Sequence, residues 1–191
     1  MQYINQPLVS KIRQKFCNVN TCPISGDRIF FENAGGALTL KSVLETTTKF
    51  ASIPDNQGRD NLASQALNDV IKNAKSDLSE LFNTQSGEFF MGESGTELLF
   101  RLIRNAVVAS PSGGSVVGTS LEHPASRSAA KKWSNEMGYT YLSVPHSVET
   151  GTVNPKNYAD KISDTTRVVT IVHASPVTGM GTKIKEISKI V

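Results

Sequence analysis

Three short polar segments of this sequence carry side chains that could bind a phosphate group or transfer a proton. They cover residues 92–97, 120–126 and 173–179, and each follows a short apolar segment that predicts a β-strand. Ligands of open parallel sheets bind beyond the carboxyl ends of the strands. We therefore expect the three segments to lie at one edge of a sheet, where segments that follow neighbouring strands face the same crevice.

The first segment predicts an anion site at the start of a helix. Backbone N–H groups at a helix N-terminus, together with the helix dipole, attract negative charge. Ser94 and Thr96 add hydroxyl donors, and Gly95 lets the main chain approach a ligand closely. The pattern suits a phosphate, although it has neither the lysine of a P-loop nor the glycine spacing of a dinucleotide fingerprint. The structural alternative is that Ser94 or Thr96 only caps the helix.

The other two segments offer an imidazole and two hydroxyl groups. His123 follows the predicted strand at residues 115–119, where its ring could stack on a flat aromatic ligand or transfer a proton near neutral pH. The alternative is a loop histidine that is fixed in front of a helix begun by Pro124. In the third segment Ser175 and Thr178 could supply hydroxyls to a ligand, and the alternative is a turn that starts the next connection.

The elements that must position these segments alternate along the chain. Short apolar runs predict strands at residues 28–31, 88–91, 115–119, 139–144 and 167–172. Helical spacing of apolar residues predicts helices at residues 7–16, 61–81, 96–109, 125–137, 155–163 and 183–190, and one more that Thr39 caps and that ends near residue 51. Short strands joined by crossover helices predict an α/β fold, a three-layer sandwich with a mostly parallel sheet. Because no strand follows the last helix, we expect the domain to be incomplete.

Composition excludes several classes of protein. With 191 residues, 38% of them hydrophobic and 19% charged, the chain can bury a core. The net charge is only +3 and the basic residues are scattered, which argues against a nucleic-acid partner. No apolar run approaches the roughly 18 residues of a membrane span, and no secretory signal is evident. Cys17 and Cys22 cannot form a four-ligand zinc site alone, so we expect two reduced thiols in a cytoplasmic protein without a metal.

Four motifs in order resemble the successive landmarks of the class V aminotransferase family. They are Phe-Phe-Glu-Asn-Ala-Gly-Gly at 30–36, Ser-Gly-Thr-Glu at 94–97, Glu-His-Pro-Ala at 122–125 and Ser-Pro-Val-Thr-Gly at 175–179. This branch of pyridoxal 5'-phosphate (PLP) enzymes includes cysteine desulfurases, selenocysteine lyases and kynureninases. The resemblance implies an aspartate aminotransferase-like large domain, here incomplete. Residues 1–60 would be an N-terminal segment with an active-site loop, and residues 61–191 the first part of the PLP-binding domain.

The resemblance also implies roles for the residues of the first two polar segments. In the family, the turn that matches Ser94, Gly95 and Thr96 holds the cofactor phosphate, which agrees with the argument from the helix N-terminus. The histidine that matches His123 stacks on the pyridine ring and assists proton transfer, so His123 is the predicted catalytic residue.

Further positions follow from the other two motifs. In the family, the loop that matches Asn33, Gly35 and Gly36 lies over the site and helps to contain the substrate. Many members have an asparagine near the cofactor's phenolic oxygen where this chain has Pro176, and we expect Thr178 to replace that contact. The substrate would be a small amino acid, and the complete protein a homodimer.

Two parts of the family's chemistry are expected beyond Val191. They are the lysine that bonds to the cofactor aldehyde and the aspartate that pairs with the ring nitrogen, and Lys183, Lys185 and Lys189 do not fit the lysine's place. The chain is therefore interpreted as the N-terminal portion of a PLP-dependent lyase or transferase such as a cysteine desulfurase. The alternatives are a non-catalytic member kept for binding or dimer formation, and an unrelated α/β domain that binds a phosphate ligand.

Overall fold

Backbone contacts divide the chain into two compact units, residues 1–89 and 90–191. The computed structural model describes residues 5–54 and 57–191. The functional division between residues 60 and 61 stays a prediction. In the described part of the chain, no helix combines the length and the apolar character that crossing a bilayer demands.

The first unit contains three helices and one short hairpin among its described residues. The helices are α1 (Gln6–Arg13), α2 (Lys41–Ala51) and α3 (Leu62–Leu81), and β1 (Thr21–Cys22) pairs antiparallel with β2 (Gly26–Asp27). The side chains of Asn5 and Asn61 cap α1 and α3 by accepting hydrogen bonds of 2.9 Å from first-turn amides. All three helices are predicted by the sequence.

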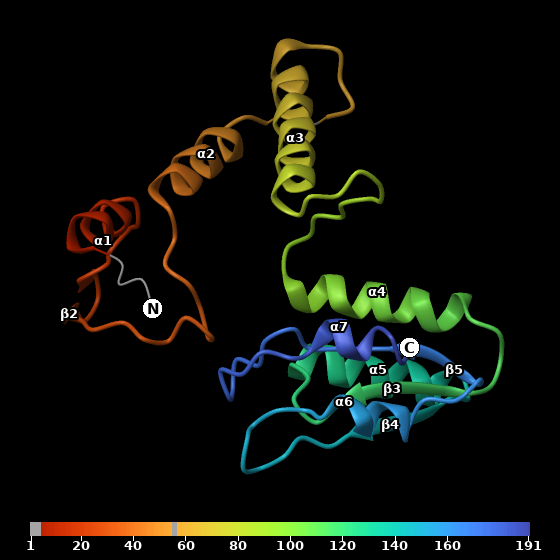
Figure 1. The fold of residues 1–191 in the computed structure, drawn as a ribbon. Coiled ribbons are helices and arrows are strands. Elements are labelled where there is room, and N and C mark those ends of the chain that lie inside the picture. Colours follow the sequence, from red (N-terminus) through yellow and green to blue (C-terminus); the bar gives the residue numbers. More distant parts are fainter. Residues whose placement is uncertain (1–4, 55–56) are drawn as a thin grey trace. The chain divides into compact units, whose positions relative to one another are not determined.

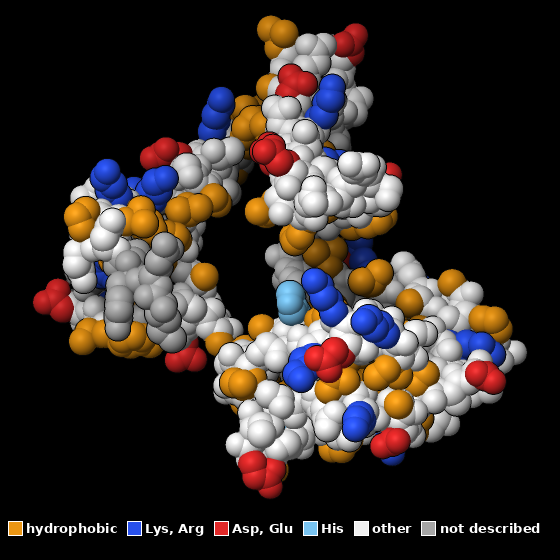
Figure 2. Space-filling view, in the orientation of Figure 1, with side chains coloured by type: hydrophobic (Ala, Val, Ile, Leu, Met, Phe, Trp, Pro, Cys, Tyr) orange, Lys and Arg blue, Asp and Glu red, His pale blue; other side chains and the backbone are white. Residues whose placement is uncertain are grey.

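No hydrophobic side chain is buried among the described residues of the first unit. Leu62, Leu81 and Phe82 are 84%, 74% and 66% exposed, and Figure 2 shows apolar side chains on the surface of this unit. Because helices in proteins draw most of their stability from packing an apolar face, the described helices of this unit gain little stability from full burial.

The second unit is built on a parallel sheet of three strands (Figure 1). The strands are β3 (Ser115–Thr119), β4 (Thr140–Val144) and β5 (Thr166–Val169), arranged in the order β4-β3-β5. The helices are α4 (Gly95–Ala109), α5 (Pro124–Glu136), α6 (Pro155–Ala159) and α7 (Ile184–Ile187). Parallel strands that alternate with helices confirm the predicted α/β class.

Two apolar clusters lie on opposite faces of β3, whose five residues are all buried. Val116 packs with residues of α4 and α5, whereas Val117 packs with residues of α6 and α7. Because neighbouring residues of a strand point to opposite faces, helices cover both sides of the sheet. This is the three-layer arrangement that the sequence predicts.

Two predicted strands are wrong. Residues 28–31 and 88–91 have irregular backbone and pair with none of the described strands. A strand requires a neighbour for its N–H and C=O groups, and apolar composition alone does not supply one. Phe31 and Phe90 consequently remain 89% and 82% exposed.

Several predicted boundaries also shift for local reasons. The helix α2 begins after Leu40, so its N-cap residue is Leu40 and not Thr39. The backbone of Thr39 is paired instead, since its carbonyl accepts a 2.8 Å hydrogen bond from the amide of Cys17. The strand β5 ends at Val169 and does not reach residue 172, because the amide of Val172 turns away to bond a carboxylate oxygen of Glu122 at 2.8 Å. The helices α6 and α7 end earlier than predicted, at residues 159 and 187.

Two adjacent valines of α4 test the packing of this core. Val107 is completely buried and Val108 is 44% exposed. Val107→Ala should lower the free energy of unfolding by about 2 kcal/mol, since it removes buried methyl groups and leaves a cavity. Val108→Ala, the matched control, should change it by less than about 0.5 kcal/mol. Urea unfolding followed by circular dichroism measures both, and equal losses would contradict the packing of α4 described here.

Candidate functional site

The N-terminus of α4 keeps several hydrogen-bond donors free of helical partners. The hydroxyl oxygen of Ser94 accepts a 3.2 Å hydrogen bond from the amide of Glu97 and so caps the helix, as the structural alternative predicts. A hydroxyl can accept one bond and still donate another. The amides of Gly95 and Thr96 open the helix and have no carbonyl four residues earlier within it. Capping and anion binding are therefore compatible at this turn.

The two glycines of this turn have different surroundings. A Cβ atom on Gly92 would lie 2.6 Å from a carboxylate oxygen of Glu97 and 2.8 Å from a methyl group of Leu98, so the loop lies tightly against the first turn of α4. A Cβ atom on Gly95 would meet no described atom within 4 Å. Glycine at position 92 is thus explained by packing, whereas the backbone of Gly95 is open to a ligand.

His123 is the N-cap of α5, and this contact orients its ring. The Nδ1 atom accepts a 3.2 Å hydrogen bond from the amide of Ala125, while Pro124 occupies the first helical position. Because a neutral imidazole has one donor and one acceptor nitrogen, acceptance at Nδ1 places the proton on Nε2. The ring is exposed, so Nε2 is accessible from outside the protein.

The structure brings Thr96 and His123 to one hollow of about 530 Å³. The α4 helix contributes Thr96 and Phe100, and the start of α5 contributes His123 together with the basic side chains of Arg127 and Lys131. The two residues meet because α4 packs along α5, not because both follow a strand: the segment before Ser94 is irregular. The hollow combines amide, hydroxyl, imidazole and cationic donors.

Arg127 and Lys131 were missed by reasoning from strand ends. They follow His123 at intervals of four residues, which places all three on one face of α5. Lys131 also lies over the ring of Tyr141, with 5.7 Å between its Nζ atom and the ring centroid. The spacing of basic residues after the histidine is the signal that could have identified them.

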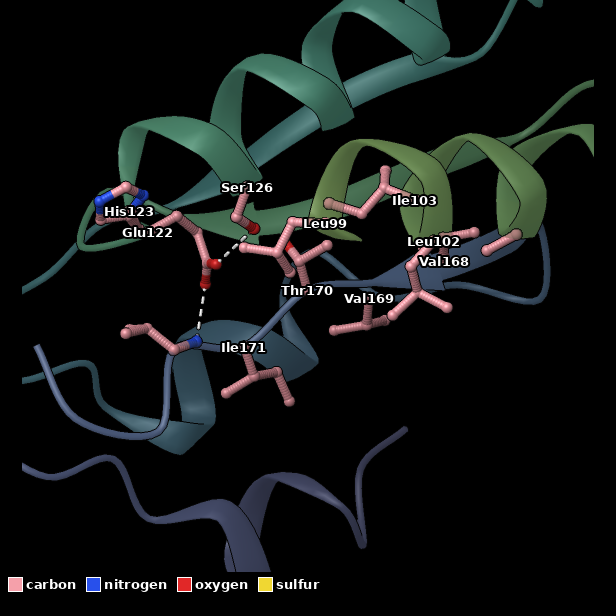
Figure 3. Close-up of a pocket in the computed structure, with 12 residues that line it drawn as sticks. Leu99, Leu102, Ile103, Glu122, His123, Ser126, Val168, Val169, Thr170 and Ile171 are labelled. Atoms are coloured by element: carbon pink, nitrogen blue, oxygen red, sulfur yellow. Dashed lines mark hydrogen bonds between the residues drawn. The ribbon is translucent and has the colours of Figure 1, made fainter. Parts of the chain in front are cut away.

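A second, apolar hollow of about 410 Å³ adjoins the first at His123 (Figure 3). Its wall consists mainly of α4 side chains and of β5 with the segment that follows it. The lining residues are Leu99, Leu102, Ile103, Ala106, Glu122, His123, Ser126 and Val168–Val172. Glu122 is the acidic residue in this apolar lining, and it is only 6% exposed. Sequence reasoning used Glu122 only as part of a motif and assigned it no role.

The polar residues that follow β5 form a turn of their own. The hydroxyl oxygen of Ser175 accepts hydrogen bonds from the amides of Val177 and Thr178 at 3.2 and 3.3 Å. Thr178 lies against the loop after β4, where a Cβ atom on Gly151 would be 3.2 Å from its own Cβ. Thr178 lines neither hollow around His123, so its contact with a cofactor stays a prediction.

Asn33, Gly35 and Gly36 belong to the first unit, where they form an exposed turn. The amides of Gly35 and Gly36 donate to the carbonyl of Glu32 at 3.0 and 3.1 Å. A Cβ atom on Gly35 would approach the Glu32 side chain to 3.2 Å, whereas Gly36 has open space around it. The role of these residues toward a substrate stays a prediction.

Both cysteines are free thiols of the first unit. Hydrogen bonds from the side chain and backbone of Ser25, followed by one from the backbone of Ile24, lower the pKa of the Cys22 thiol to about 7. Cys22 is therefore partly thiolate at neutral pH. It lies in the β1–β2 hairpin and lines neither of the hollows around His123.

Comparison with known proteins shows the family to which the chain belongs. The model of class-V aminotransferases matches residues 29–191. The chain belongs to the class V aminotransferase family. Among its relatives, a cysteine desulfurase-like protein of Aspergillus flavus is 29% identical over 175 residues, which cover 88% of this chain and 39% of that protein. A cysteine desulfurase of Nostoc sp. is 30% identical over 125 residues, which cover 64% of this chain and 30% of that enzyme.

Solved structures show that this class V aminotransferase chain shares its fold with larger proteins. The apo cysteine desulfurase of Thermococcus onnurineus superposes with a TM-score of 0.78 at 18% identity, over 100% of this chain and 46% of that one. A mutant of the protein C-DES, with glycine covalently linked to its PLP cofactor, superposes with a TM-score of 0.73 at 19% identity, over 93% of this chain and 45% of that one. The chain thus spans less than half the length of these proteins, as a partial PLP-transferase domain does.

The donor set around the first hollow fits the cofactor on which this family depends. Free amides at a helix N-terminus and the Thr96 hydroxyl suit a phosphate group, and an exposed, oriented imidazole suits the edge or face of a flat ring. Membership of the family also removes the alternative of an unrelated phosphate-binding domain.

The cap formed by Ser94 can be measured separately from any ligand. Ser94→Ala should lower the free energy of unfolding by about 1 kcal/mol, because the Glu97 amide loses its acceptor. Ser94→Gly should cost only a few tenths of a kcal/mol, because glycine is itself a tolerated N-cap. Chemical unfolding of the two variants in the absence of cofactor provides the comparison, and an alanine variant as stable as the unchanged protein would show that the cap contributes nothing.

Proposed function

We propose that this chain forms the part of a PLP-dependent enzyme that holds the cofactor's phosphate and ring, in a protein that acts on a small amino acid as cysteine desulfurases do. The observation that carries the proposal is the hollow shared by Thr96 and His123, in which a helix N-terminus and an imidazole face the same space. The cysteine desulfurase relatives and the family match support the reaction class.

The phosphate would be held at the start of α4. The amides of Gly95 and Thr96 and the hydroxyls of Ser94 and Thr96 would donate to its oxygens, with the positive end of the helix dipole behind them. Arg127 lines the same hollow and offsets part of the phosphate charge. Hydrogen bonds between such donors and a charged oxygen are stronger than those between neutral groups.

His123 would lie against the cofactor ring and hold a proton near the reacting carbon. Its Nδ1 atom accepts the hydrogen bond of the Ala125 amide, so Nε2 carries the proton and would be the atom that donates it. When PLP is bound it supplies an electron sink for the substrate amino acid. The first turn of α5 fixes Nδ1 of His123, and this keeps Nε2 directed at the site.

The remaining assignments extend this proposal to the complete protein. Asn33, Gly35 and Gly36 would help to contain the substrate, and Thr178 would contact the cofactor. A homodimer and a cytoplasmic location belong to the same proposal, as does a substrate of the cysteine class. The substrate class draws on the known activity of the relatives that are cysteine desulfurases.

The phosphate assignment predicts the behaviour of two Thr96 variants. In the full-length protein, Thr96→Ala should weaken PLP binding by about 1–3 kcal/mol, the cost of losing a hydrogen bond to a charged group. Thr96→Ser keeps the hydroxyl and should bind PLP nearly as well as the unchanged protein. Fluorescence titration with PLP gives the dissociation constants, and an unchanged constant for the alanine variant would remove Thr96 from the phosphate site.

The role of His123 is best tested with asparagine. His123→Asn keeps a side-chain acceptor at the N-cap of α5 but removes the ring and its proton. Turnover of the full-length enzyme should fall by about 100-fold or more, the scale of general acid–base catalysis. The dissociation constant of PLP should change by a smaller factor. A variant with full activity on cysteine would exclude His123 from catalysis.

A further inference from the structure

Glu122 is a buried acidic residue whose carboxylate accepts three hydrogen bonds from three different segments. Its Oε1 atom accepts from the hydroxyl of Thr119 at 3.2 Å and from the amide of Val172 at 2.8 Å. Its Oε2 atom accepts from the hydroxyl of Ser126 at 2.8 Å. Both oxygens of the carboxylate therefore have a hydrogen-bond partner.

These three bonds join the elements that surround the site. Thr119 is the last residue of β3, Ser126 lies in the first turn of α5, and Val172 belongs to the segment that follows β5. The bond to Val172 spans fifty residues of sequence and ends the hydrogen-bonding ladder of β5. One side chain therefore connects the carboxyl ends of the neighbouring strands β3 and β5 to the first turn of α5, the helix that follows β3.

The hydrogen bonds of Glu122 also constrain the next residue in the chain, His123. His123 follows Glu122 in the chain, and its ring is oriented by the amide of Ala125, one residue before the Ser126 that Glu122 binds. Figure 3 shows the two side chains pointing in different directions from the same loop, the carboxylate into the protein and the imidazole toward the outside. The hydrogen bonds of the Glu122 carboxylate inside the protein thus fix the loop that carries the imidazole.

We infer that Glu122 is a positioning residue that fixes His123 at the mouth of the cofactor site, an inference that rests on the proposed function. Glu122 does not act on the phosphate, because Thr96 and the start of α4 make no hydrogen bond to it among the described residues. Its effect is on the ring side of the site, through the backbone of the loop and the first turn of α5.

A buried carboxylate with this arrangement is costly to disturb. Removing its side chain leaves the hydroxyls of Thr119 and Ser126 and the amide of Val172 without their acceptor, and unsatisfied buried groups destabilise the local structure. The charge also reaches nearby hydroxyls: burial, followed by the charge of Glu122, raises the pKa of Tyr141 and of Tyr158.

The first experiment measures the connection itself, without any ligand. Hydrogen exchange of the apo full-length protein is followed by mass spectrometry in the peptide that contains Val172. Glu122→Ala should accelerate exchange of that amide at least tenfold, whereas Glu122→Gln, which keeps an acceptor oxygen, should retain most of the protection. Glu136→Gln is the matched control, because Glu136 is an exposed glutamate at the far end of α5, paired with Lys132, and it should leave the peptide unchanged.

The second experiment separates the ring side of the site from the phosphate side. Pyridoxine 5'-phosphate has no aldehyde and cannot bond to a lysine, so its affinity reports the non-covalent contacts alone. Glu122→Ala should raise its dissociation constant about tenfold while leaving that of inorganic phosphate within about twofold. Glu122→Gln should recover most of the affinity for pyridoxine 5'-phosphate. If the alanine variant does not fold, Ser126→Ala, which removes one of the three donors, is measured with the same two probes.

The outcomes distinguish the inference from the proposed function. If the unchanged protein binds neither pyridoxine 5'-phosphate nor inorganic phosphate, the proposed function falls and the inference falls with it. If it binds both, but the variants lose affinity for the two probes equally, Glu122 has a general structural role and the inference alone is overturned. Unaltered exchange at Val172 in the alanine variant would overturn it as well.

Discussion

The arrangement of the second unit depends on the close packing of α4 against α5. Both helices cover the same face of β3, and the buried residues between them include Ile103 and Val107 from α4 and Ala129 and Ala130 from α5. Alanines on one surface let the other helix approach closely. Because the two helices start near the same edge of the sheet, this packing brings the free amides of one and the N-cap imidazole of the other to a single hollow.

The sequence predicts well those elements that have a distinct local pattern. The segment 115–119 is apolar throughout, is flanked by turns, and forms the buried central strand β3. The segments 28–31 and 88–91 look similar in composition but stay irregular, because a strand is completed by a partner that composition does not reveal. The start of a helix can be predicted where one side chain caps it, as Asn61 and Ser94 do. The start of α2 cannot be predicted in this way, because its N-cap residue, Leu40, makes no side-chain hydrogen bond.

The same distinction applies to the candidate site. Thr96 and His123 could be identified because each follows an apolar segment and opens a helix, which is a local pattern. Glu122 could not be identified, since its role is defined by the amide of Val172, fifty residues later in the chain. Thr178 also follows a strand, and its side chain lies against the loop at Gly151, so its contact with a cofactor stays a prediction.

Stability and function share residues in this unit, and Glu122 shows how. A carboxylate inside an apolar wall is a poor source of net stability, because desolvation offsets much of what its hydrogen bonds contribute. What it does supply is directionality: three donors from three segments fix one geometry, whereas an apolar side chain of the same volume could pack in several. The position of the His123 loop is consequently set by a polar contact of defined distances within an otherwise apolar layer. Substitutions deep in the α4–α5 interface would shift the hollow as a whole, whereas substitutions at Glu122 would shift its His123 side relative to its Thr96 side.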